Sequence, residues 1–252
     1  MLFTEYGRPE NPPVLLLHGM MQDWHSEYEL LKPLEAHYRL IIPAQDGFYD
    51  GSGDFTSFAD QARQIEDYVQ AHHNGRLHGA YGASQGGLML TELLTRNKIR
   101  LGCVIMDGCY VAHQGWIAGW VTCKMFCRFK NTGKFPAPIM LTMKLMGLKA
   151  EDLGMMDSLY MNASDETIRR NFLENYTYRT RPEIARNETM VHLWCGSREP
   201  YAIKSHNILK RYLKNCREEI MPGFGHGEFL MKHQGEICEK IRATLQETAP
   251  SR

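Results

Sequence analysis

The residues with the most telling spacing are Gly82, Ser84 and Gly86, a Gly-x-Ser-x-Gly pattern between an apolar run and the helix-like residues 88–94. Small residues on both sides of a serine allow a tight turn from a strand into a helix, which lifts the hydroxyl toward solvent. The pattern predicts that Ser84 is a nucleophile for acyl transfer. The alternative is a glycine-rich turn in which Ser84 only caps the helix.

A serine hydroxyl is a weak nucleophile at neutral pH, so Ser84 needs a base, and the base needs an orienting acid. The predicted base is His226, which lies in the Pro-Gly-Phe-Gly-His-Gly sequence of residues 222–227. This loop follows the last strand-like run of the chain. Its small residues leave room to present the imidazole at the edge of a sheet, which distinguishes His226 from the other ten histidines.

Two carboxylates follow strand-like runs and are candidates for the acid. Glu199 precedes Pro200, which biases it away from a helix and toward an extended loop. Asp107 ends another apolar run, and both residues would reach the carboxyl edge of a parallel sheet, where sites in open α/β folds form. We favour Glu199 as the acid and keep Asp107 as the alternative. A pairing of Glu199 with Arg198, or a helix cap, is the non-catalytic interpretation.

Acyl transfer also needs donors for the negative charge that develops on the carbonyl oxygen. The backbone amide of Gln85, directly after the serine, is one predicted donor. The second is the amide of Met20, since Gly19 allows a sharp turn after the apolar run that ends at His18.

Short apolar runs alternate with longer helix-like segments along most of the chain, as in a mostly parallel α/β sheet. The expected strands are residues 14–17, 39–42, 77–81, 101–106, 191–195 and 219–221, with residues 2–6 as an antiparallel edge strand. The clearest helices are residues 58–71 and 88–95.

The segment of residues 110–189 is far longer than a crossover between strands requires, and it is rich in methionine and aromatic residues. We interpret it as a helical cap inserted into a core of residues 1–109 and 190–252. Methionine and aromatic side chains line adaptable apolar pockets. The predicted substrate-binding residues are therefore Met21, Trp24, Trp116 and Trp120.

The composition of the chain bears on which partners it binds and on where in the cell it is located. The 29 basic and 29 acidic residues balance, so we expect neither a nucleic-acid partner nor stable membrane association. Seven cysteines with scattered spacing favour reduced thiols over a disulfide framework. With no leader-like start, a cytoplasmic location is the expectation.

These motifs, in this order, resemble a serine hydrolase of the α/β-hydrolase superfamily. The resemblance runs through Leu15-Leu16-Leu17-His18-Gly19, the Ser84 pentapeptide, Gly196-Ser197-Arg198-Glu199-Pro200 and Gly225-His226. It implies an eight-stranded, mostly parallel sheet with a cap after the sixth strand. The short N-terminal region implies that one strand is missing or reduced. The family more often has Asp where this chain has Glu199.

The resulting hypothesis is hydrolysis of a carboxylic ester with a small to medium hydrophobic group, through an acyl-enzyme and without a cofactor or metal. Thioester, amide, lactone and carbon–carbon hydrolysis use the same residues and stay open. A ligand-binding homologue without turnover is a different class of hypothesis. The methionine-rich cap is also a candidate contact surface for a homodimer.

Overall fold

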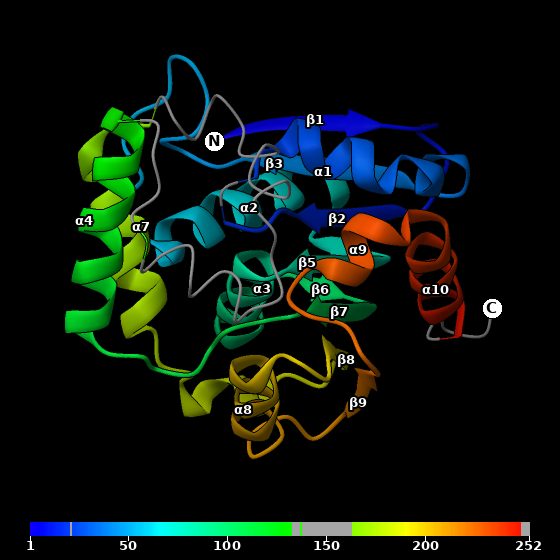
Figure 1. The fold of residues 1–252 in the computed structure, drawn as a ribbon. Helices are drawn as coiled ribbons and strands as arrows, with labels where there is room; N and C mark the ends of the chain where they lie inside the picture. The colour runs from blue at the N-terminus through cyan, green and yellow to red at the C-terminus, as the bar shows by residue number, and fades with distance from the viewer. Residues whose placement is uncertain (21, 133–136, 138–162, 248–252) are drawn as a thin grey trace.

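The computed structural model describes residues 1–20, 22–132, 137 and 163–247, and its centre is a seven-stranded sheet in the order β1-β3-β2-β5-β7-β8-β9 (Figure 1). The strands are β1 (Leu2–Tyr6), β2 (Pro13–Leu17), β3 (Arg39–Ala44), β5 (Gly79–Ala83), β7 (Cys103–Asp107), β8 (Met190–Gly196) and β9 (Cys216–Met221). Only β1 is antiparallel to its neighbour. The predicted α/β class and the antiparallel edge strand are confirmed.

Two expected strands are each divided. Residues 76–83 form β4 (Arg76–Leu77) and β5, and residues 100–107 form β6 (Arg100–Leu101) and β7, with β4 and β6 pairing in a small sheet of their own. At the first break the His78 N–H donates to the Pro13 carbonyl, and at the second the Gly102 N–H donates to the Leu77 carbonyl. The backbone therefore changes hydrogen-bond partner within runs that look continuous in sequence.

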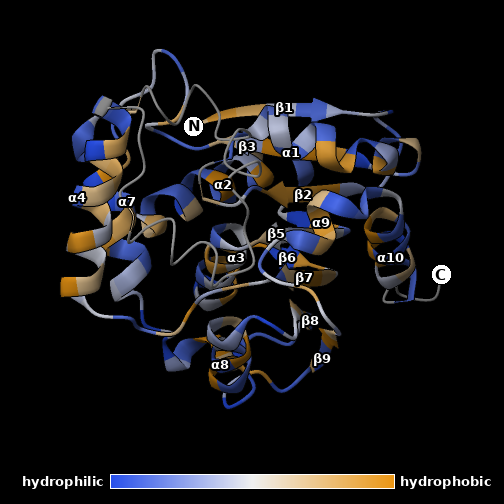
Figure 2. Cartoon of the chain, viewed as in Figure 1, coloured by the Kyte–Doolittle hydropathy of each residue, from blue (hydrophilic) through white to orange (hydrophobic). Residues whose placement is uncertain are grey.

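The sheet is buried on both faces, which explains the uninterrupted apolar runs of its central strands. In β2, Leu15 and Leu17 point into one cluster of buried residues, while Val14 and Leu16 point into the other. The covering helices in Figure 2 carry hydrophobic and hydrophilic residues on different sides. The helices are α1 (Trp24–Leu31), α2 (Phe58–His73), α3 (Gln85–Arg96), α4 (Trp116–Thr132), α7 (Asp165–Thr177), α8 (Pro200–Leu209), α9 (Glu228–Lys232) and α10 (Gln234–Glu247), with 3₁₀ turns at Lys32–Ala36 and Pro182–Arg186.

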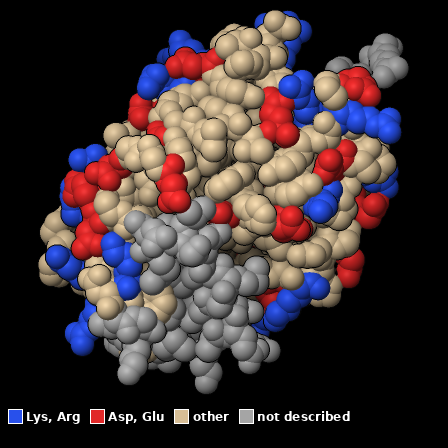
Figure 3. Space-filling model, turned by 90° about the horizontal axis from the view of Figure 1, so that it is seen from above, with Lys and Arg blue, Asp and Glu red and all other residues tan. Residues whose placement is uncertain are grey.

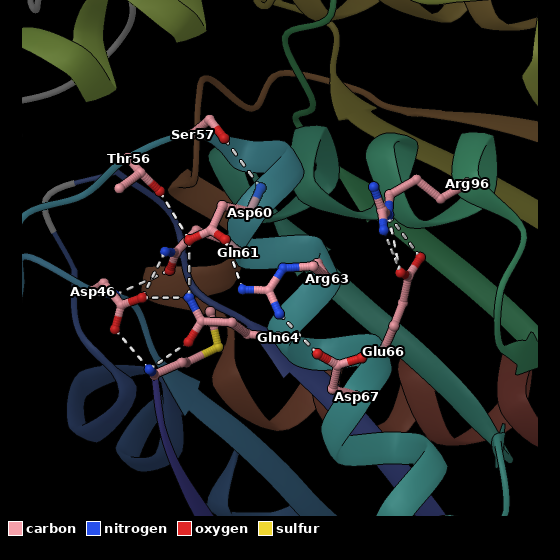
Figure 4. Close-up of polar contacts among 11 residues, drawn as sticks. Asp46, Thr56, Ser57, Asp60, Gln61, Arg63, Gln64, Glu66, Asp67 and Arg96 are labelled. Carbon is pink, nitrogen blue, oxygen red and sulfur yellow. Dashed lines mark hydrogen bonds and ion pairs between the residues drawn. The ribbon is translucent and has the colours of Figure 1, made fainter.

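Polar contacts join α2 to the loop after β3 and to α3 (Figure 4). The side-chain amides of Gln61 and Gln64 donate to the carboxylate of Asp46, just beyond β3. Farther along the helix, Glu66 accepts paired hydrogen bonds of 2.7–3.0 Å from Arg96 of α3. These contacts anchor the loop after β3 and hold α2 against α3.

Between β7 and β8 the chain forms α4 and α7, which lie side by side at the left of Figure 1. Phe126 of α4 packs on Phe172 of α7 with ring centroids 4.7 Å apart. Part of the expected cap, residues 133–136 and 138–162, lies outside the described residues, so its boundaries at 110 and 189 stay a prediction.

Charged residues of both signs are interspersed on the face seen in Figure 3, around a broad uncharged area. Within the described ranges, no helix combines the length and apolar character needed to cross a bilayer.

Leu15→Ala is expected to lower the free energy of unfolding by about 2–5 kcal/mol, because Leu15 is fully buried between the sheet and its helices. Leu2→Ala is the matched control, since Leu2 is 48% exposed on β1; its expected loss is below about 1 kcal/mol. Urea unfolding followed by circular dichroism measures both. Equal losses would contradict the assignment of the core.

Candidate active site

Ser84 occupies the turn between β5 and α3, and its backbone is in an unusual conformation. Its φ of 50° and ψ of −109° lie where a residue with a Cβ is strained. The turn requires backbone segments to pass close to Gly82 and Gly86. A Cβ on Gly82 would lie 2.5 Å from the Gly86 carbonyl carbon, and one on Gly86 would collide with the Leu17 carbonyl oxygen. The two glycines of the motif are therefore required by packing, and they leave the serine side chain at the tip of the turn.

His226 lies in the loop between β9 and α9, and its imidazole bridges two of the predicted residues. The Ser84 hydroxyl donates to Nε2 over 2.9 Å, and Nδ1–H donates to Glu199 Oε2 over 2.6 Å. The side chain of His226 is 16% exposed and that of Glu199 only 3%. Three residues from distant parts of the chain thus form one continuous hydrogen-bonded series.

Glu199 is held independently of the histidine. It precedes Pro200 at the start of α8, and its Oε1 accepts the Gly196 N–H over 2.6 Å. Arg198 instead pairs with Glu228, so the non-catalytic pairing considered for Glu199 does not form. Both oxygens of the buried carboxylate are occupied, which fixes its orientation toward the imidazole.

Asp107, the alternative acid, has a different partner. Its Oδ2 accepts a hydrogen bond of 2.9 Å from the Tyr81 hydroxyl, and His226 Nδ1 is already bonded to Glu199. Burial, followed by the nearby charge of Glu199, raises the pKa of Asp107 to about 7. A carboxyl group with a pKa near 7 is only partly ionised at neutral pH, so it is poorly suited to orient an imidazolium. The geometry therefore favours Glu199 for that position.

The two predicted amide donors belong to the residue after the serine and to a loop that passes beside it. Gln85 is the first residue of α3, where backbone N–H groups have no partner within the helix. A Cβ on Gly19 would lie 3.5 Å from Ser84 Cβ, so the loop that contains Met20 passes directly beside the serine. The Gly19 N–H itself donates to the Gln22 side chain over 3.1 Å.

The structure adds a wall to the site that the motifs did not reveal, built by Gly108 and Tyr110. The Tyr110 ring stacks on the His226 imidazole with centroids 4.7 Å apart and planes 23° apart. Burial and the charge of Glu199 raise the pKa of Tyr110, so its hydroxyl stays protonated and donates toward that carboxylate. A Cβ on Gly108 would lie 3.0 Å from Glu199 Oε2, so only glycine fits there comfortably. The only sequence signal for this wall was its position directly after a strand end.

The predicted substrate-binding residues lie in separate places. Met21 is outside the described residues. Trp24 is half-buried and packs in the cluster beneath α1 and α10. Trp116 and Trp120 stack on each other along α4 and are 57% and 43% exposed. These tryptophans contact residues other than Ser84, His226 and Glu199, and their substrate role stays a prediction.

A third buried acid, Glu27 of α1, lies close enough to Asp107 for their charges to interact. Its side chain is inaccessible to solvent, and neither oxygen has a hydrogen-bond partner among the residues that the structure describes. Burial, with a smaller contribution from Asp107, raises the pKa of Glu27 to about 8. Glu27 is therefore mostly protonated in the folded protein at neutral pH.

The sequence profile of the alpha/beta hydrolase fold family matches residues 12–138. A search of curated proteins found no match. Among solved structures, a protein of Desulfitobacterium hafniense assigned to the alpha/beta hydrolase family superposes with a TM-score of 0.83 at 22% identity, covering 97% of this chain and 100% of its own.

Two further similar structures are of enzymes with a named activity. An esterase from Thermogutta terrifontis has a TM-score of 0.75 at 17% identity, covering 98% of this chain and 93% of its own. An enol-lactonase from Burkholderia xenovorans has a TM-score of 0.73 at 14% identity, covering 97% and 96% respectively. At these identities the similarity establishes the fold.

Glu27→Gln is expected to flatten the pH dependence of stability. Between the usual pKa near 4.5 and about 8, the unfolded chain has Glu27 ionised while the folded protein keeps it protonated. Stability therefore falls as pH rises through this window, by about 1.4 kcal/mol per pH unit for one group. Urea unfolding at pH 5, 6 and 7 should show a slope smaller by about that amount in Glu27→Gln.

Glu29→Gln, an exposed substitution in the same helix, is the control and should retain the wild-type slope. Identical slopes for wild type and Glu27→Gln would show that Glu27 is not held protonated.

Proposed function

The chain belongs to the alpha/beta hydrolase fold family, and on this premise we propose that it is a serine hydrolase cleaving carboxylic esters of small to medium hydrophobic compounds. Ser84 is the nucleophile, His226 the base and Glu199 the orienting acid. The observation that carries the proposal is the series Ser84 Oγ to His226 Nε2, 2.9 Å, and His226 Nδ1 to Glu199 Oε2, 2.6 Å. Such a series activates a hydroxyl that is otherwise a weak nucleophile.

In the acylation step, Ser84 Oγ attacks the ester carbonyl carbon while His226 Nε2 accepts the hydroxyl proton. The amides of Gln85 and Met20 donate to the oxyanion of the tetrahedral intermediate. When that intermediate collapses, the carbon–oxygen bond to the alcohol breaks and His226 returns its proton to the departing oxygen. Water then attacks the acyl-enzyme with His226 again as base, which releases the carboxylic acid and restores Ser84.

Glu199 contributes by holding the imidazole in place. Its hydrogen bond to Nδ1 selects the tautomer whose Nε2 lone pair faces the serine, and its negative charge stabilises the imidazolium that forms. Tyr110 limits water access to one face of the same imidazole.

Ester hydrolysis is preferred over the related reactions because alkoxide leaving groups need the least additional machinery in a site of this kind. The thermophilic esterase among the structural neighbours agrees with this choice.

All seven cysteines are free thiols, which supports our proposal of a cytoplasmic location.

The direct test is hydrolysis of p-nitrophenyl esters with acyl chains of two to about twelve carbons. Wild type is expected to turn over the shorter or middle members, and Ser84→Ala to lose at least about 10³-fold in kcat. Turnover by Ser84→Ala at the wild-type rate would overturn the proposal. Absence of turnover with every ester, in folded protein, would favour another bond type or a binding role.

A paired substitution separates the two acids. Glu199→Gln is expected to lower kcat by about 10³–10⁴-fold, because the amide can neither fix the productive tautomer nor stabilise imidazolium. Asp107→Asn should cost less than about 10-fold, since asparagine resembles the protonated acid that burial favours there. Steady-state kinetics at pH 7 measures both, and the reverse order of losses would assign the acid role to Asp107.

A further inference from the structure

Buried amide side chains connect helix α7, the first residue of α3 and the residue that follows β3. The Asn175 amide of α7 donates to Gln85 Oε1 over 2.9 Å, and Gln85 Nε2 donates to Gln45 Oε1 over 3.0 Å. Asn175 also donates to the Asn171 carbonyl one turn earlier, over 3.0 Å. Each of the four residues is at most 8% exposed. The Gln85 side chain is thus bonded at both ends, once to α7 and once to the residue that follows β3.

Both anchors are themselves fixed to the core. On one side of Asn175, Glu174 accepts the Phe58 N–H at the start of α2 over 2.9 Å. On the other, the Tyr176 carbonyl accepts the Gln114 N–H over 2.8 Å. Gln45 is followed by Asp46, which is bonded to α2 as Figure 4 shows. The Gln85 side chain is therefore held between two residues, Asn175 and Gln45, whose neighbours are hydrogen-bonded to other parts of the fold.

Gln85 is the only residue of the first turn of α3 that can be held in this way. Gly86 and Gly87 follow it and carry no side chains, and Ser84 makes no side-chain cap to the helix. The backbone N–H of Gln85 is also the donor placed next to the serine. The contacts of the Gln85 side chain are therefore a restraint on the direction of that N–H, in addition to the backbone packing of the turn.

We propose that Asn175 is a positioning residue that, through the Gln85 side chain, aims the Gln85 backbone N–H at the oxyanion. This inference rests on the proposed hydrolase function. It makes α7 part of the machinery that stabilises the transition state, rather than only a cover over the substrate. Because oxyanion donors act in a preorganised, dry site, a small change in their direction lowers the rate of the chemical step.

Asn175→Ala is expected to lower kcat by about 10-fold or more while changing KM by less than about 2-fold. An alkyl boronic acid, which forms a tetrahedral anion on the serine, should bind Asn175→Ala more weakly by the same factor as kcat/KM falls. Gln85→Ala, which keeps the backbone N–H, should show a similar loss. The double variant should be no worse than Gln85→Ala alone, since both act through one side chain.

Asn187→Ala is the matched control, because Asn187 is also a buried asparagine, bonded to the Leu94 carbonyl at the far end of α3. It should keep the wild-type kcat and boronate affinity even if its melting temperature falls. If Asn175→Ala does not fold, Asn175→Asp replaces it, since it keeps the size and removes the donor.

Two outcomes would overturn the inference in active wild-type protein: an unchanged kcat in Asn175→Ala, or additive losses in the double variant. Wild type that neither turns over esters nor binds the boronate would instead reject the proposed function on which the inference rests.

Discussion

The backbone of Ser84 is held at a positive φ, and the geometry of the site depends on that strained turn. The strain is sustained by packing on every side. The Ser84 N–H donates to the Asp107 carbonyl over 2.7 Å, and Gly86 lies so close to the Leu17 carbonyl that no side chain fits between them. Strands β2, β5 and β7 therefore all brace the turn. A strained residue persists only where the surrounding sheet is well packed. This packing allows the Ser84 hydroxyl to project from the start of α3 toward the site.

Burial separates the roles of three neighbouring carboxyl groups. Glu199 has two close N–H donors, which hold its carboxylate toward His226. Asp107 has a single neutral donor, and Glu27 has none among the described residues, so burial raises the pKa of both. Repulsion from Glu199 adds to the shift in Asp107. One negative charge is thereby concentrated beside the imidazole, where it can stabilise a cation.

Much of this arrangement could be predicted from the sequence, because its components follow strand ends. Ser84, Glu199 and His226 each lie within five residues of the end of a strand, and parallel strands bring their carboxyl ends to one edge. Their proximity was therefore predictable, whereas their catalytic roles remain proposals. The division of the 77–81 run at His78 was not predictable, because it depends on a hydrogen bond to Pro13, far away in the chain.

Side chains that reach the site from outside the motifs were also missed. Tyr110 stacks on His226 only because of the path of the loop after β7, and Asn175 meets Gln85 only because the fold brings α7 within hydrogen-bond distance of that side chain. Neither has a local pattern that distinguishes it from an ordinary aromatic or amide residue. Trp116 and Trp120, which the sequence predicts to bind substrate, are exposed on α4, and that role stays a prediction.

The central claim is that Ser84 is an activated nucleophile. Its most direct test is intact-mass analysis and peptide mapping after reaction with a fluorophosphonate, on wild type, Ser84→Ala and His226→Ala. We predict one adduct per chain, located on Ser84, absent from Ser84→Ala and formed far more slowly in His226→Ala. Folded wild type that stays unlabelled, or an adduct that persists in Ser84→Ala, would contradict the claim.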